Sequence, residues 1–108
     1  MRRGDIVTVA GGVYVSKPRP ALIVQDDRFD VTDSLTVCPL TSTEVAAPLL
    51  RVPVTADKEN GLDQDSFLMV DKVTTVRRSN AHGVVGRIEA TTLVEFERRL
   101  LVFLGFGG

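Results

Sequence analysis

The residue types most often used for catalysis are scarce in this chain. It contains one histidine, His82, and one cysteine, Cys38. Histidine is the usual general acid or base near neutral pH, but His82 lies in the turn-like stretch 79–83, where a solvated side chain is the simpler interpretation. Cys38 lies inside the apolar run 35–40, which favours a buried hydrophobic role over a reactive thiol. Neither residue by itself predicts an enzyme.

Charged residues are clustered, but the chain as a whole lacks the net positive charge that would attract a polyanion. The 13 basic and 14 acidic residues sum to −1, so any nucleic-acid site has to be local. Basic residues gather at 2–3, 17–19, 77–78 and 98–99. The acidic stretch 57–65 matches no calcium loop and is typical of a solvated turn. We therefore expect no metal and no cofactor.

Short β-strands have to position whatever site exists. Asn60-Gly61 predicts a turn with positive φ angles, and proline at positions 18 and 20 holds Lys17 and Arg19 extended at the start of the second strand. Many short strands in so short a chain indicate a barrel or a closed, twisted sheet. The expected strands are 5–10, 21–25, 35–40, 49–55, 66–70, 73–76 and 83–88.

The end of the chain changes to helical periodicity. Leu93, Phe96, Leu100, Phe103 and Leu104 share one helical face. Residues 92–95 match a capping box, positions 89 and 91 are alternative caps, and glycine at 105 predicts the stop. Since no linker or repeat interrupts the chain, we expect one domain over 1–108 that is mainly β with a C-terminal α-helix.

Composition also limits location and assembly. A single cysteine rules out an intramolecular disulfide, and the amino terminus runs into charge instead of an apolar signal segment, so we predict a cytoplasmic protein. The apolar stretch 100–106 is too short to span a bilayer. A chain of 108 residues buries a limited share of its surface, so it would gain stability from a homodimer interface.

Several motifs occur in the order and spacing of one family. The chain resembles the MazF/PemK toxins of type II toxin–antitoxin systems, and the resemblance covers almost its whole length. The matching segments are RGDIV (3–7), KPRPALIV (17–24), PLTS (39–42), NGL (60–62), DS (65–66), DKVTTV (71–76), VGRI (85–88) and the closing helix that ends LG (104–105).

The resemblance implies a fold, an activity and partners. The fold would be a small SH3-like β-barrel of the CcdB/MazF type, closed by the C-terminal helix and acting as a homodimer. The activity would be that of a metal-independent endoribonuclease, an mRNA interferase that cuts single-stranded mRNA at short sequences through attack by the 2′-hydroxyl. A cognate antitoxin protein would neutralise it.

The resemblance also assigns roles to residues. The family's catalytic arginine and threonine match Arg19 and Thr41, and the flanking Lys17, Ser42 and Thr43 are the expected RNA-binding residues. A guanidinium suits the work because it stays charged and grips two phosphate oxygens. The loop 10–16 lacks the glutamate that some relatives use as a general base, so that role cannot be transferred.

Two other functions remain open at the level of sequence. A CcdB-like toxin shares the fold but poisons DNA gyrase through its C-terminal end, and the tail 103–108 is compatible with that activity. A non-catalytic barrel that binds nucleic acid or a peptide is the other alternative, because a fold alone does not determine an activity. Gyrase poisoning would not need Arg19, and a non-catalytic barrel would tolerate loss of the Thr41 hydroxyl.

Overall fold

The computed structural model describes residues 1–10 and 17–106, which form seven strands, three short 3₁₀ turns and one α-helix. The strands are β1 (Asp5–Val9), β2 (Arg19–Ile23), β3 (Ser34–Thr41), β4 (Arg51–Val54), β5 (Ser66–Met69), β6 (Thr74–Arg77) and β7 (Ala81–Arg87). The 3₁₀ turns are η1 (Asp27–Phe29), η2 (Val70–Lys72) and η3 (Arg78–Asn80), and the helix is α1 (Ala90–Phe103). All seven predicted strands exist, with ends shifted by a few residues.

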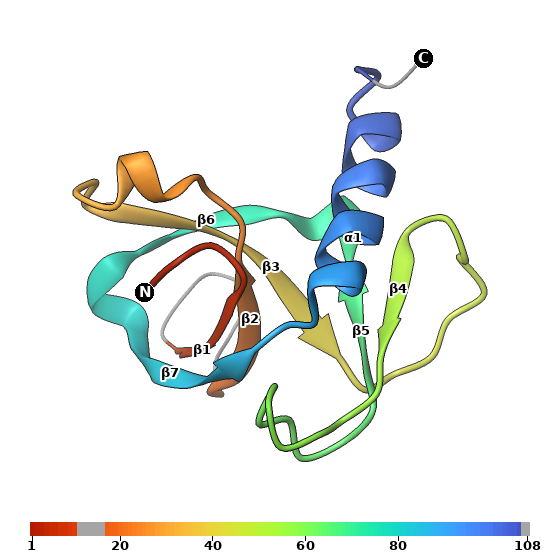
Figure 1. The fold of residues 1–108 in the computed structure, drawn as a ribbon, viewed down its shortest axis with the longest axis horizontal. Coiled ribbons are helices and arrows are strands. Elements are labelled where there is room, and N and C mark those ends of the chain that lie inside the picture. The colour runs from red at the N-terminus through yellow and green to blue at the C-terminus, as the bar shows by residue number, and fades with distance from the viewer. Residues whose placement is uncertain (11–16, 107–108) are drawn as a thin grey trace.

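The sheet is antiparallel and strongly bent. Its order is β4-β5-β3-β2-β1-β7, and β6 also pairs with β3. Strand β3 makes the bend because its first half pairs with β6 and its last two residues pair with β5. Figure 1 shows β1, β2, β3, β6 and β7 curving around a common centre, with α1, β4 and β5 to one side. The predicted fold class is confirmed, although the ladders of the described residues leave the sheet open where a closed barrel was expected.

The curvature buries both faces of β1, β2 and β3. Alternate residues of one strand belong to different clusters: Ile6 packs under the helix, whereas Val7 packs inside the curl. The helix-side cluster contains Ile6, Leu22, Cys38, Leu40, Leu68 and Phe96, and the inner cluster contains Val7, Val9, Ala21, Ile23, Leu35 and Val37. Strands buried on both faces read as apolar runs, not as alternating ones.

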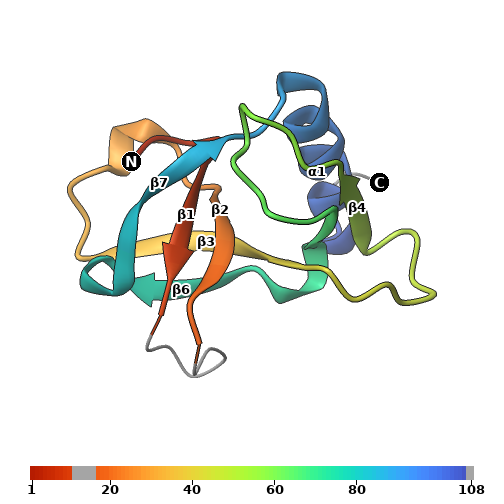
Figure 2. The same ribbon diagram turned by 90° about the horizontal axis from the view of Figure 1, so that it is seen from below.

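The C-terminal helix covers one side of the sheet, as Figure 2 shows from below. Its N-cap is Glu89, which makes no side-chain capping bond. Of the three alternative caps predicted from the sequence, position 89 is therefore confirmed, whereas the capping box at 92–95 is wrong because the helix already begins at Ala90. Phe96 is fully buried and Leu93 and Leu100 pack beside it, while the carboxyl end of the helix is exposed. Gly105 ends the helix with a φ of 83°.

The turn before β5 also differs from the prediction. Only Gly61 has a positive φ, whereas Asn60 is buried in an ordinary conformation. A Cβ on Gly61 would stand 2.1 Å from the carbonyl oxygen of Val85, so the turn packs directly on the backbone of β7. No helix in the described ranges has the length and apolar character needed to cross a membrane.

Candidate functional site

Arg19 and Thr41 occupy the facing ends of two neighbouring strands. Arg19 is the first residue of β2 and Thr41 the last of β3. These strands are antiparallel with Ala21 opposite Pro39, and the same register continued by two residues brings Arg19 opposite Thr41. Opposite residues on antiparallel strands project from the same face. The topology therefore places the guanidinium of Arg19 and the hydroxyl of Thr41 on the same side of the sheet, next to one region of space.

That volume is a surface cavity of about 320 Å³. Arg19 is exposed and Thr41 half-buried, so both side chains are accessible. The wall combines cations and hydroxyls with apolar surface, which is the composition expected of a site for a phosphate flanked by a base. The lining residues are Arg19, Pro39, Leu40, Thr41, Thr43, Met69 and Lys72.

The hydroxyl of Thr41 is oriented by its own chain. Its Oγ1 accepts a hydrogen bond of 3.1 Å from the backbone N–H of Thr43. Because that bond uses a lone pair, the hydroxyl proton stays available for donation. The β-branched side chain also has few rotamers. Thr41 is thus set to donate toward an anion, and Thr43 holds it in place.

Lys72, which from the sequence is only a weaker candidate for an RNA contact, also lines this cavity. It ends η2, and the preceding residue Asp71 accepts a 2.6 Å ion pair from Nη1 of Arg51 on β4. Burial disfavours the charge on Asp71, but Arg51 outweighs burial and lowers the pKa of the carboxyl. Within the described chain, neither Lys72 nor Arg19 takes part in an ion pair. Both cations are therefore free to meet an anion.

A second cavity of about 160 Å³ is also lined by Arg19 and shares Leu40 with the first. Ser42 lines this second cavity. Asp63 and Gln64 from the loop before β5, and Ser66, the first residue of β5, line it as well. Besides the guanidinium of Arg19, its polar groups are a carboxylate, an amide and hydroxyls. Arg19 thus lines both a cavity that also holds Lys72 and one that is rich in hydrogen-bond acceptors.

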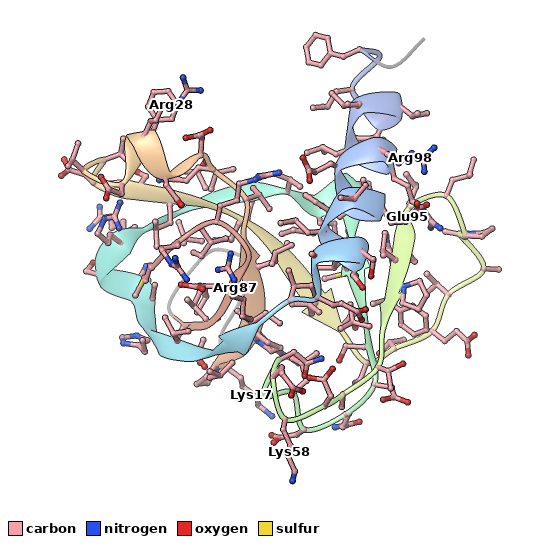
Figure 3. The ribbon with its side chains drawn as sticks, in the orientation of Figure 1. Lys17, Arg28, Lys58, Arg87, Glu95 and Arg98 are labelled. Carbon is pink, nitrogen blue, oxygen red and sulfur yellow. The ribbon has the colours of Figure 1, made fainter. Side chains whose placement is uncertain are left out.

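The remaining predicted residues lie around these cavities. Thr43 lines the first cavity, whereas Lys17 lines neither and is exposed two positions before Arg19. Figure 3 shows Lys17 extending outward below β2. His82 is exposed on β7, outside both cavities. The absence of a glutamate concerns the loop 10–16, of which residues 11–16 lie outside the described residues.

Cys38 and the carboxylates do not form a further reactive centre. Cys38 is buried, and burial raises the pKa of its thiol to about 12, which confirms the hydrophobic role predicted for it. In residues 1–10 and 17–106, no three His, Cys, Asp or Glu side chains come together in a way that could hold a metal ion.

Comparison with known proteins gives matches over almost the whole chain. Residues 2–104 match the family described as PemK-like, MazF-like toxin of type II toxin-antitoxin system. A protein of Mycolicibacterium smegmatis described as "Probable endoribonuclease MazF" is 54% identical over 109 residues, covering 100% of both chains.

Solved structures share the architecture at lower identity. The "Mycobacterium tuberculosis toxin MazF-mt6" superposes with a TM-score of 0.80 at 22% identity, over 94% of this chain and 96% of that one. A Deinococcus radiodurans "MazE-MazF" structure gives 0.80 at 24% identity, covering 97% and 95%. An "Endoribonuclease in complex with its cognate antitoxin from Mycobacterial species" gives 0.77 at 21% identity, covering 97% and 95%. At these identities the superpositions establish the fold.

Proposed function

The chain belongs to the PemK-like, MazF-like toxin family of type II toxin–antitoxin systems. We propose that it is an endoribonuclease toxin that cleaves single-stranded mRNA and that Arg19 and Thr41 are its catalytic residues. The observation that carries the assignment of these two residues is that both line one accessible cavity at the facing ends of β2 and β3. A similar relative is described as an endoribonuclease, and the cavity has the cations that such an activity needs.

The reaction uses a nucleophile that RNA itself carries. The 2′-oxygen attacks the adjacent phosphorus, the bond from phosphorus to the 5′-oxygen breaks, and the products are a 2′,3′-cyclic phosphate and a 5′-hydroxyl. The 2′-hydroxyl proton is lost and the leaving oxygen gains one. Arg19 holds two phosphate oxygens and stabilises the charge of the phosphorane, while the proton of Thr41 binds a non-bridging oxygen. None of these contributions requires a metal.

Flanking residues extend the RNA contact. Thr43 orients Thr41 through its backbone N–H and adds its own hydroxyl to the same cavity. Ser42 faces the second cavity, and Lys17 attracts the RNA backbone from the exposed segment before β2. The protein works in the cytoplasm, where mRNA is found.

Two protein partners belong to the proposal. One is a cognate antitoxin, since structural neighbours were solved as complexes with such proteins. The other is a second copy of this chain. The carboxyl end of α1 and the residues after it expose Val102, Phe103, Leu104 and Phe106, and apolar surface of this kind is typical of an interaction site.

The test is cleavage of a long single-stranded RNA by purified protein in the presence of a chelator. We expect the wild type to cut, and Arg19→Ala and Thr41→Ala each to lose on the order of 100-fold in rate, as for loss of one donor to a reacting oxyanion. Thr41→Ser, which keeps the hydroxyl, should recover part of the loss. Arg98→Ala is the matched control, because Arg98 lies exposed on α1 (Figure 3).

Three results would contradict the proposal. Equal rates for the wild type and Arg19→Ala would remove the arginine from the chemistry. Cleavage that stops with chelator would establish a metal mechanism. A third result would be that the wild type and all variants leave the RNA intact, although expression of the wild type still arrests cell growth. This result would favour the gyrase-poisoning activity, which a supercoiling assay with purified gyrase measures directly.

A further inference from the structure

The loop that carries Asp63 is held rigid by its own polar side chains. Buried Asn60 is the centre of this network: its Oδ1 accepts from the backbone N–H of Asp57 and Leu62, and its Nδ2 donates to the carbonyl of Thr55. Additional bonds run from Asn60 N–H to Asp57 Oδ1, from Ala56 N–H to Asp65 Oδ1 and from Ser66 Oγ to the carbonyl of Gln64. The loop is therefore preorganised between β4 and β5.

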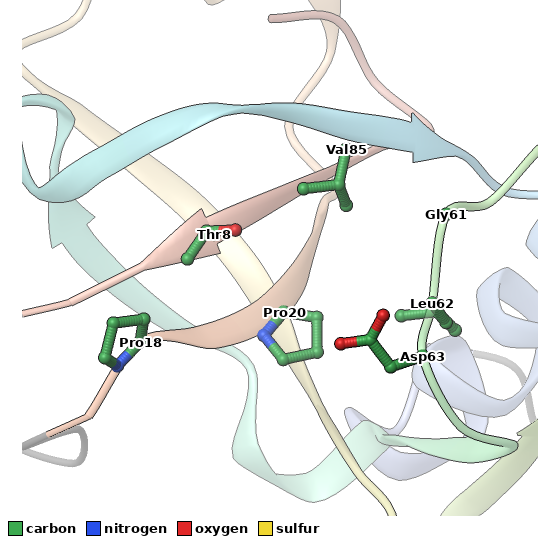
Figure 4. Close-up of a pocket in the computed structure, with 7 residues that line it drawn as sticks. All are labelled: Thr8, Pro18, Pro20, Gly61, Leu62, Asp63 and Val85. Atoms are coloured by element: carbon green, nitrogen blue, oxygen red, sulfur yellow. The ribbon is translucent and has the colours of Figure 1, made fainter.

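Asp63 stands apart from this network. The carboxylates of Asp57 and Asp65 accept bonds from the loop backbone, whereas that of Asp63 forms no hydrogen bond or ion pair within the described chain. Figure 4 shows it pointing across the opening toward Pro20, beside Leu62. A rigid loop thus presents one unused carboxylate to solvent.

The carboxylate of Asp63 faces two cavities, and Arg19 lines one of them. Asp63 lines the second cavity with Arg19 and Ser42, and it also lines a further cavity of about 250 Å³. Pro18, Pro20 and Leu62 form apolar walls common to both. Apolar walls with a few fixed polar groups suit a flat, unstacked base better than a phosphate, which the negative charge of Asp63 would repel.

A carboxylate selects among the four bases because it only accepts hydrogen bonds. Guanine presents two adjacent donors, N1–H and the N2 amino group, which match the two oxygens of one carboxylate. Adenine and cytosine place an acceptor beside their amino group, and uracil flanks its single N–H with two carbonyls. Parallel charge-assisted bonds are the strong ones, so guanine is the best partner.

From this arrangement we propose that Asp63 is a specificity-determining residue that binds guanine in a nucleotide next to the phosphate held by Arg19. The proposal rests on the proposed ribonuclease function. Gln64 and Ser42 complete the subsite with an amide and a hydroxyl that can meet the guanine carbonyl. The segment between β4 and β5 then determines which RNA sequence is cleaved, while Arg19 and Thr41 at the ends of β2 and β3 catalyse the cleavage.

The experiment sequences the 5′-hydroxyl ends that the protein produces from a long RNA of mixed sequence. We expect the wild type to favour guanine at one position near the cut, and Asp63→Asn to lose that preference by about ten- to a hundredfold, the usual value of a hydrogen bond to a charged group. Glu59→Gln removes the same charge from an exposed position of the same loop that lines neither cavity. It should keep the preference.

A second measurement separates base recognition from a positioning effect on Arg19. Replacing the preferred guanine by inosine removes only the N2 amino group, so it should slow the wild type about tenfold and leave Asp63→Asn almost unaffected. An equal loss of rate on every sequence, or an unchanged guanine preference in Asp63→Asn, would overturn the inference while leaving the nuclease intact. Absence of cleavage by the wild type would instead refute the proposed function itself.

Discussion

Replacing Asn60 by alanine should destabilise the protein more than replacement of an ordinary, solvated turn residue does. Asn60 is 3% exposed and its side chain makes three bonds to the loop backbone: 3.1 Å from Asp57 N–H, 3.0 Å from Leu62 N–H and 2.8 Å to Thr55 O. Alanine removes all three and fills none of the space. A net value of about 1 kcal/mol for each bond gives about 3 kcal/mol in the free energy of unfolding.

Urea unfolding followed by far-ultraviolet circular dichroism measures this loss. With a slope of about 1.5 kcal/mol per M for a chain of this size, the midpoint should fall by about 2 M. Asn80→Ala is the matched control, because Asn80 is half-buried and contributes its backbone carbonyl, which alanine retains, to a 3.0 Å bond from Ala10. Its midpoint should change little.

The outcome discriminates between a structural network and an ordinary solvated turn. Equal midpoints for Asn60→Ala and Asn80→Ala would refute the argument that the loop is held by the buried amide. The Asn60→Ala variant should also lose guanine preference if it still folds, because Asp63 would no longer be held in one position.

Two further predictions concern acid stability and assembly. Arg51 holds the pKa of Asp71 below its ordinary value, so the stability that this carboxyl contributes is present above its unfolded pKa of about 3.8 and is lost as pH falls through the folded pKa. Urea midpoints of the wild type should therefore drop between pH 5 and pH 3 more than those of Asp71→Asn, and parallel curves would contradict the ion pair. Light scattering at micromolar concentration should give twice the mass of one chain, and a mass that stays at one chain would argue against the homodimer.

Much of the local structure could be predicted from residue types. The prolines around Arg19 mark the start of β2, and the apolar run around Cys38 identifies β3. The helical period beginning at Leu93 identifies α1 over most of its length. These signals are local because they depend on backbone restriction and on the alternation of side chains within one element. The exact ends were less predictable, since caps such as Glu89 depend on where the chain leaves the sheet.

The candidate site was predictable only in part. Arg19 and Thr41 came from motif matches, and the register of β2 and β3 explains why the two residues meet. Lys72 was only a weaker candidate because a lysine of this kind is often a paired surface charge, and Asp63 was left aside because an aspartate in an acidic turn is usually solvated. No sequence signal distinguishes Asp63 from Asp57 or Asp65; only the hydrogen bonds made by the other two do so.

Local patterns of residues therefore specify the kinds of elements, their order and the two residues proposed for the chemistry. Proline restriction, side-chain alternation and helical period are properties of neighbouring residues, and they survive without knowledge of the fold. Which charged side chains form ion pairs and which remain unpaired depends on the folded arrangement. The tertiary structure bends β3 so that both faces of the sheet are buried, binds Asp71 to Arg51 and leaves Lys72 at the cavity. Such partnerships join residues distant in the chain, so only the folded chain can specify them.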